Sequence, residues 1–79
     1  MNDNKEWPKL FTKPGCSGCD AVLLSGATSD VVIISVDDSI TMAEAAFLDV
    51  WEYPTLLFSN GDRITGDADK IIKLLSKGE

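Results

Sequence analysis

The only two cysteines of the chain, Cys16 and Cys19, stand three residues apart in the stretch FTKPGCSGCD. Two small residues, Ser17 and Gly18, separate them, and the chain contains no histidine. A thiol pair with this spacing can exchange with a disulfide, hold half of a metal site or form a short structural crosslink. The surrounding sequence decides which of these is favoured.

Three structural alternatives to redox chemistry are weak here. A disulfide across so short a loop would restrict the unfolded chain very little. Two cysteines and no histidine cannot complete a four-ligand zinc site without carboxylates or a second subunit, so we expect no metal site. Two inert core thiols are the third alternative. A C-x-x-C pair beside a strand–helix–strand pattern favours thiol–disulfide exchange over all three.

The elements around the pair place it where a thiolate is favoured. A short apolar strand is expected over residues 9–12, and a helix with one apolar face over residues 17–24. Cys16 falls at their junction, near unpaired N–H groups and the positive end of the helix dipole. Lys13, three residues earlier, adds a positive charge nearby. Cys19 lies one helical turn further on the same face, so it can reach Cys16 and close a disulfide.

The rest of the chain predicts a small mixed α/β domain. The apolar, largely β-branched run at 31–36 predicts a strand buried on both faces. Thr41 and Glu44 predict a capping box for the second helix, Asn60-Gly61 a tight hairpin, and Asp67 a cap for the last helix. The remaining elements are expected to be a helix at 41–50, strands at 55–59 and 63–65, and a helix at 68–77.

This β-α-β-α-β-β-α order predicts one domain over residues 1–79, with a mixed four-stranded sheet and helices on both faces. Seven basic and thirteen acidic residues give a net charge of −6, which disfavours nucleic-acid binding. The chain begins without an apolar run of signal-peptide length, and none of its runs approaches the ~18 apolar residues of a membrane span. We therefore expect a cytoplasmic protein with neither nucleic acid nor membrane as partner.

At three stretches, the chain resembles the thioredoxin-like superfamily, most closely a small glutaredoxin or glutaredoxin-like redoxin. FTKPGCSGC resembles the glutaredoxin strand–loop–helix, including a lysine three residues before the first cysteine. YPTLLFSNGDRITG resembles the segment that runs from the cis-proline of this superfamily through a hairpin. TGDADKI resembles the Gly-Asp segment that begins the last glutaredoxin helix. The predicted element order extends the resemblance over nearly the whole chain.

The resemblance implies that Pro54 follows a cis peptide bond and faces the cysteines, with Tyr53 beside the site. It also implies a binding region for substrate or glutathione, formed by Lys13, Ser17, Gly18, Tyr53, Pro54, Gly66 and Asp67. The chain departs from glutaredoxins at three points. Ser-Gly replaces Pro and an aromatic residue between the cysteines, Glu52-Tyr53 replaces Thr-Val before the proline, and Thr65-Gly66 replaces a Gly-Gly pair.

Several side chains near the site have a structural interpretation as well as a functional one. We expect Trp51 to pack under the second helix, and Tyr53 to be exposed as part of an apolar platform. Asp67 is expected to cap a helix, with binding of a glutathione amine as the alternative. Asp37 and Asp38 are expected to form a solvated turn.

Together these residues predict a dithiol–disulfide oxidoreductase. Cys16 would attack a protein or glutathione mixed disulfide, and Cys19 would resolve the intermediate. We expect a monomer without a tightly bound cofactor, reduced by glutathione as co-substrate or by a flavoprotein thioredoxin reductase. The resemblance suggests ribonucleotide reductase as a client. A module that binds glutathione and an iron–sulfur cluster, and a non-catalytic interaction module, are the alternatives.

Overall fold

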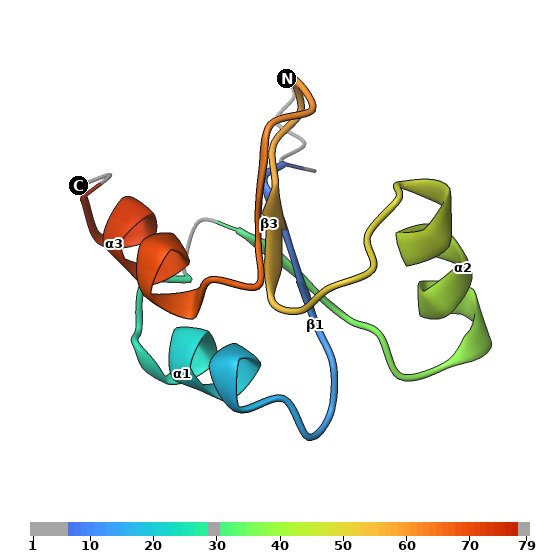
Figure 1. Cartoon of the computed structure of the whole chain (residues 1–79), viewed down its shortest axis with the longest axis horizontal. Coiled ribbons are helices and arrows are strands. Elements are labelled where there is room, and N and C mark those ends of the chain that lie inside the picture. Colours follow the sequence, from blue (N-terminus) through green and yellow to red (C-terminus); the bar gives the residue numbers. More distant parts are fainter. Residues whose placement is uncertain (1–6, 29–30, 78–79) are drawn as a thin grey trace.

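The computed structural model describes residues 7–28 and 31–77. Its elements follow the predicted order (Figure 1): β1 (Lys9–Thr12), α1 (Ser17–Leu24), β2 (Val32–Ser35), α2 (Ser39–Phe47), β3 (Thr55–Leu57), β4 (Arg63–Thr65) and α3 (Ala68–Lys77). The prediction of a small mixed α/β domain with four strands and three helices is confirmed. The first six residues, where we expect no signal peptide, lie outside the described residues.

The four strands form one mixed sheet in the order β2-β1-β3-β4. β1 is parallel to β2 and antiparallel to β3, and β3 is antiparallel to β4. Phe11 therefore lies opposite Ile34 on one side and Thr55 on the other. Because β1 and β3 are antiparallel, the end of β1 that leads to the cysteines lies beside the start of β3, which follows Pro54.

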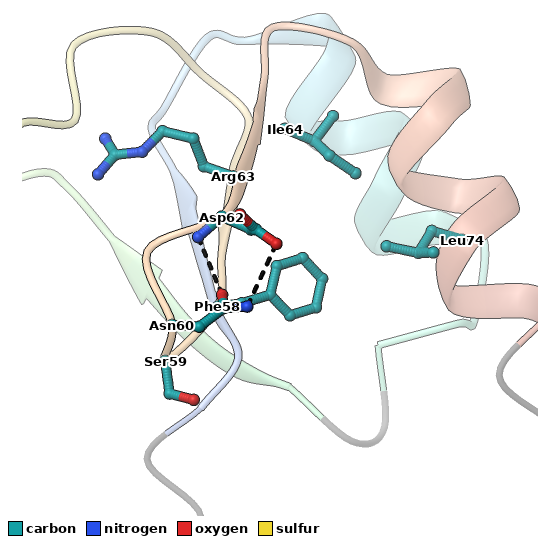
Figure 2. A pocket seen from close by; sticks show the side chains of 7 residues that line it. All are labelled: Phe58, Ser59, Asn60, Asp62, Arg63, Ile64 and Leu74. Carbon is teal, nitrogen blue, oxygen red and sulfur yellow. Dashed lines mark hydrogen bonds between the residues drawn. The ribbon is translucent and has the colours of Figure 1, made fainter.

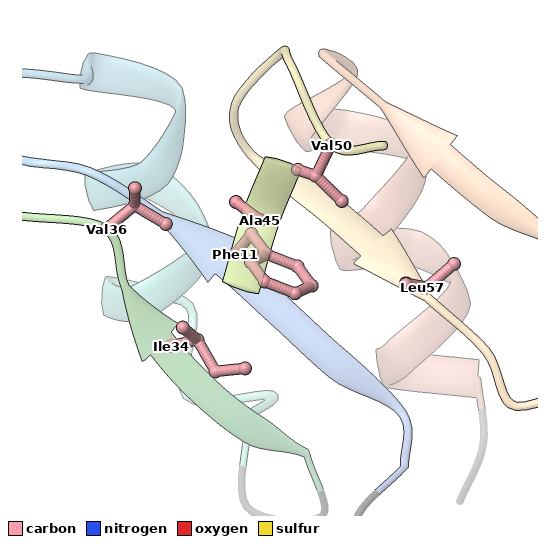
Figure 3. Packing of buried hydrophobic residues seen from close by; sticks show 6 residues of the cluster. All are labelled: Phe11, Ile34, Val36, Ala45, Val50 and Leu57. Carbon is pink, nitrogen blue, oxygen red and sulfur yellow. The ribbon is translucent and has the colours of Figure 1, made fainter. Parts of the chain in front are cut away.

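Helices cover both faces of the sheet, as expected (Figure 1). Adjacent strand residues point to opposite faces, so the fully buried Leu10 and Phe11 belong to different clusters. Leu10 packs with Val22 of α1 and Ile71 of α3. Phe11 packs on the other face in a cluster that includes a residue of α2 (Figure 3): Ile34, Val36, Ala45, Val50 and Leu57. Thus α1 and α3 share one face, and α2 covers the other.

The expectation that residues 31–36 are buried on both faces is wrong for one side of β2. Ile34 and Val36 enter the Phe11 cluster, but Ile33 is exposed. The cause is the position of β2 at the edge of the sheet, where β1 is its one neighbour among the described strands. A continuous apolar run is typical of central parallel strands, whereas an edge strand has fewer neighbours to cover it.

The second helix begins earlier than predicted, because its capping box uses different residues. Asp38 is the N-cap and accepts a hydrogen bond of 2.9 Å from the Thr41 backbone N–H. The Thr41 hydroxyl in turn accepts from the Asp38 N–H at 3.3 Å. Asp38 therefore caps the helix rather than forming only a solvated turn. The predicted partner Glu44 instead forms an ion pair with Lys9 of β1, at 3.4 Å.

The hairpin between β3 and β4 turns at the predicted Asn60-Gly61 pair, but its first strand ends earlier than predicted. Phe58 N–H donates to the Asp62 carbonyl at 2.9 Å, and Gly61 N–H donates to the Phe58 carbonyl at 3.0 Å. Gly61 has a φ of +98°, a conformation that glycine adopts without steric cost. The loop therefore contains three residues between Phe58 and Asp62, and β3 ends at Leu57 rather than at residue 59.

Among residues 7–28 and 31–77, none of the helices combines the length and the apolar character needed to span a bilayer.

Candidate functional site

Cys16 occupies the N-cap position of α1, with extended backbone dihedrals of φ −104° and ψ 109°. Its sulfur accepts a hydrogen bond of 3.1 Å from the backbone N–H of Cys19. The Cys16 carbonyl begins the helical hydrogen-bond ladder by accepting from the Asp20 N–H at 3.1 Å. The sulfur is thus held on an otherwise unpaired N–H at the positive end of the helix.

Cys19 lies one turn into α1 and is nearly inaccessible, with 1% of its surface exposed. Burial raises the pKa of its thiol from 9.0 to about 11. Interaction with the Cys16 sulfur and the charge of Asp20 act in the same direction, while a hydrogen bond to the Lys13 backbone opposes them. Both cysteines are free thiols in the structure.

The two thiols therefore differ in the way that stepwise exchange requires. Cys16 is partly exposed, so an external disulfide can reach its sulfur, which is held on the Cys19 N–H. Cys19 is buried next to it and keeps its proton at neutral pH, so it is a poor first nucleophile. It is nevertheless within reach of the Cys16 sulfur, where it can act second.

The buried thiol predicts a loss of stability at alkaline pH. The folded pKa of Cys19, about 11, lies above the ordinary 9.0, so the unfolded chain releases this proton first. The resulting stabilisation is fully present below about pH 9 and is lost as the pH rises through 11, a change on the order of 2–3 kcal/mol.

Urea unfolding of the wild type and of Cys19→Ala at about pH 8 and about pH 11 measures this loss. The wild type should lose more stability between the two pH values than the variant. The two proteins differ only at residue 19, so an equal loss in both would contradict the assignment.

Pro54 lies against the cysteine helix, as the resemblance implied. The Tyr53–Pro54 peptide bond is cis, and Pro54 is buried. A Cβ added to Gly18 would lie only 3.2 Å from the Pro54 ring and 3.6 Å from the Cβ of Ala68. Gly18 is thus the point where α1, the Pro54 segment and α3 meet, and it leaves room for that close approach. Nothing in the sequence around Ala68 predicts that this residue lies next to Gly18.

The Pro54 segment is held by hydrogen bonds on both sides. The Pro54 carbonyl accepts from the Gly66 N–H at 2.8 Å, which ties the segment to the end of β4. The buried Thr55 hydroxyl donates to the Glu52 carbonyl at 2.6 Å. These bonds fix the backbone next to the cysteine helix.

Lys13 and Tyr53 form a second part of the same region. The Lys13 ammonium lies 5.3 Å from the centre of the Tyr53 ring, within the range of a cation–π contact. Tyr53 is half-buried against the Phe11 cluster rather than exposed as expected. Both side chains line a cavity of about 290 Å³ that extends to α2 and is otherwise lined by apolar residues, including Met42 and Trp51.

The remaining predicted binding residues are distributed around this centre. Ser17 is exposed in the first turn of α1. Gly66 has a φ of +70° and is bonded to Pro54. The Asp67 carboxylate accepts from the Lys70 N–H at 3.1 Å, so its role as a cap of α3 is confirmed. Its role as a ligand for glutathione stays a prediction.

The prediction that Trp51 packs in the core is wrong, because 68% of its surface is exposed. α2 ends at Phe47, and Asp49 adopts a left-handed φ of +63° that reverses the chain. Val50 then takes the core position, and Trp51 points outward, with its indole N–H donating to the Asp49 carboxylate at 2.6 Å. Arg63 of β4 closes this turn by donating to the Asp49 carbonyl at 2.8 Å.

A second cavity, of about 610 Å³, lies away from the cysteines, between the β3–β4 hairpin and α3 (Figure 2). Phe58, Ile64 and Leu74 form its apolar walls. Asn60 and Asp62 exchange hydrogen bonds of 3.0 and 3.2 Å at its rim, which stabilise the hairpin loop. None of the predicted site residues lines this cavity, so it is separate from the candidate site.

A comparison of the chain with known protein families, characterised proteins and solved structures finds no match. The chemistry open to the site therefore follows from its own residues.

Proposed function

We propose that this protein is a dithiol–disulfide oxidoreductase of the thioredoxin-like class, most similar to a small glutaredoxin. The observation that carries the proposal is the arrangement of the two thiols on α1. The Cys16 sulfur caps the helix on the Cys19 N–H, at 3.1 Å, and remains partly exposed. The Cys19 thiol is buried beside it and stays protonated at neutral pH.

The reaction begins when the Cys16 thiolate attacks one sulfur of a substrate disulfide. A bond forms between Cys16 and that sulfur, the substrate disulfide breaks, and the other sulfur leaves as a thiolate that takes up a proton. Cys19 then gives up its proton and attacks the Cys16 sulfur. This releases the second substrate thiolate and leaves a Cys16–Cys19 disulfide, so two electrons have passed from the protein to the substrate.

The surroundings of the pair support binding of an extended substrate. Pro54 packs against Gly18 beside the cysteines. The resemblance to glutaredoxins implies that a substrate chain would lie along the backbone before it, at Tyr53. Lys13 supplies a positive charge over the Tyr53 ring, suited to a carboxylate of the substrate or of glutathione. Ser17, Gly66 and Asp67 surround this region and complete the proposed binding surface.

Each turnover leaves an internal disulfide, so the cycle needs an external reductant. We propose glutathione or a flavoprotein thioredoxin reductase for this step, and ribonucleotide reductase as a client. The proposal places the protein in the cytoplasm, where thiols are kept reduced and catalytic cysteines are more common than structural disulfides.

Coupled assays with a disulfide substrate test the proposal directly. One assay contains glutathione and its reductase, and the other contains thioredoxin reductase; consumption of the nicotinamide cofactor is the readout in both. Activity in one assay identifies the class of electron donor. Absence of activity in both would contradict the proposal, and an absorption band in the visible range after anaerobic purification would then support the cluster-binding alternative.

A further inference from the structure

Helix α2 has its polar and apolar sides reversed relative to an ordinary surface helix. Within α2, all of which the structure describes, Glu44 is the only charged residue, and it faces the sheet, where it pairs with Lys9 at 3.4 Å. Ala45, also on the inner side, is the residue of α2 that is buried. A surface helix normally directs its charged residues to solvent, and a helix that is apolar on its outer side is usually covered.

The outward side of α2 is a largely apolar surface, with Ser39 as its polar residue. At 100° per residue, its apolar side chains fall within one arc of about 160° that also contains Ser39; Thr41 lies on the opposite side, and Glu44 borders the arc next to Ile40. Phe47 is 86% exposed, Ile40 77% and Met42 58%. We define the α2 outer face as Ile40, Met42, Ala43, Ala46 and Phe47, all of them exposed. Neighbouring exposed apolar residues of this kind mark interaction surfaces.

The α2 outer face is continuous with the region around the cysteines. Met42 and Ala46 line the cavity of about 290 Å³ that Trp51, Lys13 and Tyr53 also line. The exposed Trp51 ring extends the apolar surface beyond the end of α2, and its hydrogen bond to Asp49 fixes the ring. A partner on this face would therefore reach from the far side of α2 to the edge of the candidate site.

The two ends of the α2 outer face carry negative charge. Asp37 and Asp38 are exposed before the helix, and Asp49 and Glu52 are exposed after it. At the second end, the Arg63 guanidinium donates to the Asp49 and Leu48 carbonyls, which places one positive charge beside these two carboxylates. The whole chain has a net charge of −6, which adds to the negative potential of this side.

We infer that the α2 outer face docks a partner protein through an apolar segment that carries lysine or arginine at both of its ends. The apolar centre of such a segment would cover Phe47, Ile40 and Met42. Its basic ends would meet the carboxylates before and after α2. A second copy of this chain fits worse, because parallel or antiparallel packing of two α2 helices sets negative ends against negative ends. This surface is separate from the thiol chemistry and goes beyond the proposed function.

Three synthetic peptides test this inference. The first has a leucine- and phenylalanine-rich centre with lysines at both ends, the second replaces the lysines with glutamates, and the third keeps the lysines around a serine-rich centre. Binding is measured by anisotropy of a labelled peptide and by amide chemical shifts of the full chain. The first peptide should bind about tenfold or more tightly than either other peptide and should shift amides of residues 39–51. Equal binding of all three, or no binding, would overturn the inference.

Variants of exposed residues locate the surface without disturbing the fold. Phe47→Ser should weaken binding of the first peptide about tenfold, whereas Leu24→Ser, which changes an equally exposed residue of α1, should leave it unchanged. Asp37→Lys should weaken binding of the lysine-flanked peptide with the apolar centre and strengthen binding of the glutamate-flanked one. Unchanged binding in Phe47→Ser would overturn the inference, as would a concentration-dependent dimer of the wild type that Phe47→Ser abolishes.

The same measurements on a Cys16→Ser, Cys19→Ser double variant separate docking from thiol chemistry. Peptide binding by the α2 outer face should persist in this variant, because neither cysteine belongs to that surface. Loss of peptide binding in the double variant would overturn the inference that the α2 outer face acts separately from the thiols. A failure of the disulfide assays would contradict the proposed function but would not change the peptide-binding result.

Discussion

Replacing Cys16 by serine is expected to abolish disulfide reduction, with a loss of at least about 10³-fold in rate. A serine hydroxyl can accept the same hydrogen bond from the Cys19 N–H that holds the Cys16 sulfur at 3.1 Å, so the helix cap should survive. What is lost is the sulfur, which in the proposed reaction attacks the disulfide as a thiolate. The measurement is the rate of reduction of a labelled disulfide peptide by reduced protein, under single-turnover conditions.

Cys19→Ser is the matched control, because it removes the second thiol and leaves the first. It should still react once and accumulate a mixed disulfide between Cys16 and the peptide, detectable by mass spectrometry without reductant. If Cys16→Ser retained activity, or if the peptide were trapped on Cys19 in the wild type, the assigned order of attack would be wrong.

Phe11→Ala is expected to lower the free energy of unfolding by about 3–5 kcal/mol. Phe11 is fully buried in the central strand, where it forms the middle of the cluster on the α2 side of the sheet (Figure 3). A domain of 79 residues has a total stability of roughly 4–12 kcal/mol, so this change would remove about a quarter of it or more. Urea unfolding followed by circular dichroism measures the difference.

Leu24→Ala is the control for that measurement. Leu24 is 85% exposed at the end of α1, so its truncation should change stability by less than about 0.5 kcal/mol. A cost below about 1 kcal/mol for Phe11→Ala would contradict the assignment of Phe11 to the core.

The elements around the cysteines could be predicted from sequence because their signals are local. Pro14 and Gly15 break the first strand, and the spacing of Cys19 and Val22 defines the buried side of α1. Both elements have the predicted bounds. The start of α2 is harder to predict from sequence, because Asp38 and Thr41 are both good N-caps and only the structure shows that Asp38 is the one used.

The placement of Trp51 could not be predicted, since it depends on where α2 ends. That end is set by a left-handed residue, Asp49, which is not glycine, and by the burial of Val50. The contact between Gly18 and Pro54 depends on the antiparallel register of β1 and β3, which pairs Phe11 with Thr55. No local pattern encodes such a register, so only the resemblance suggested that contact.

A redox titration of the wild-type protein tests the central claim most directly. The protein is equilibrated in buffers of defined potential and alkylated, and the fraction with both thiols free is counted by mass spectrometry. We expect one two-electron transition to an internal Cys16–Cys19 disulfide, with a midpoint between about −270 and −200 mV. Two thiols that stay free across this range, or that form disulfides only between chains, would contradict it.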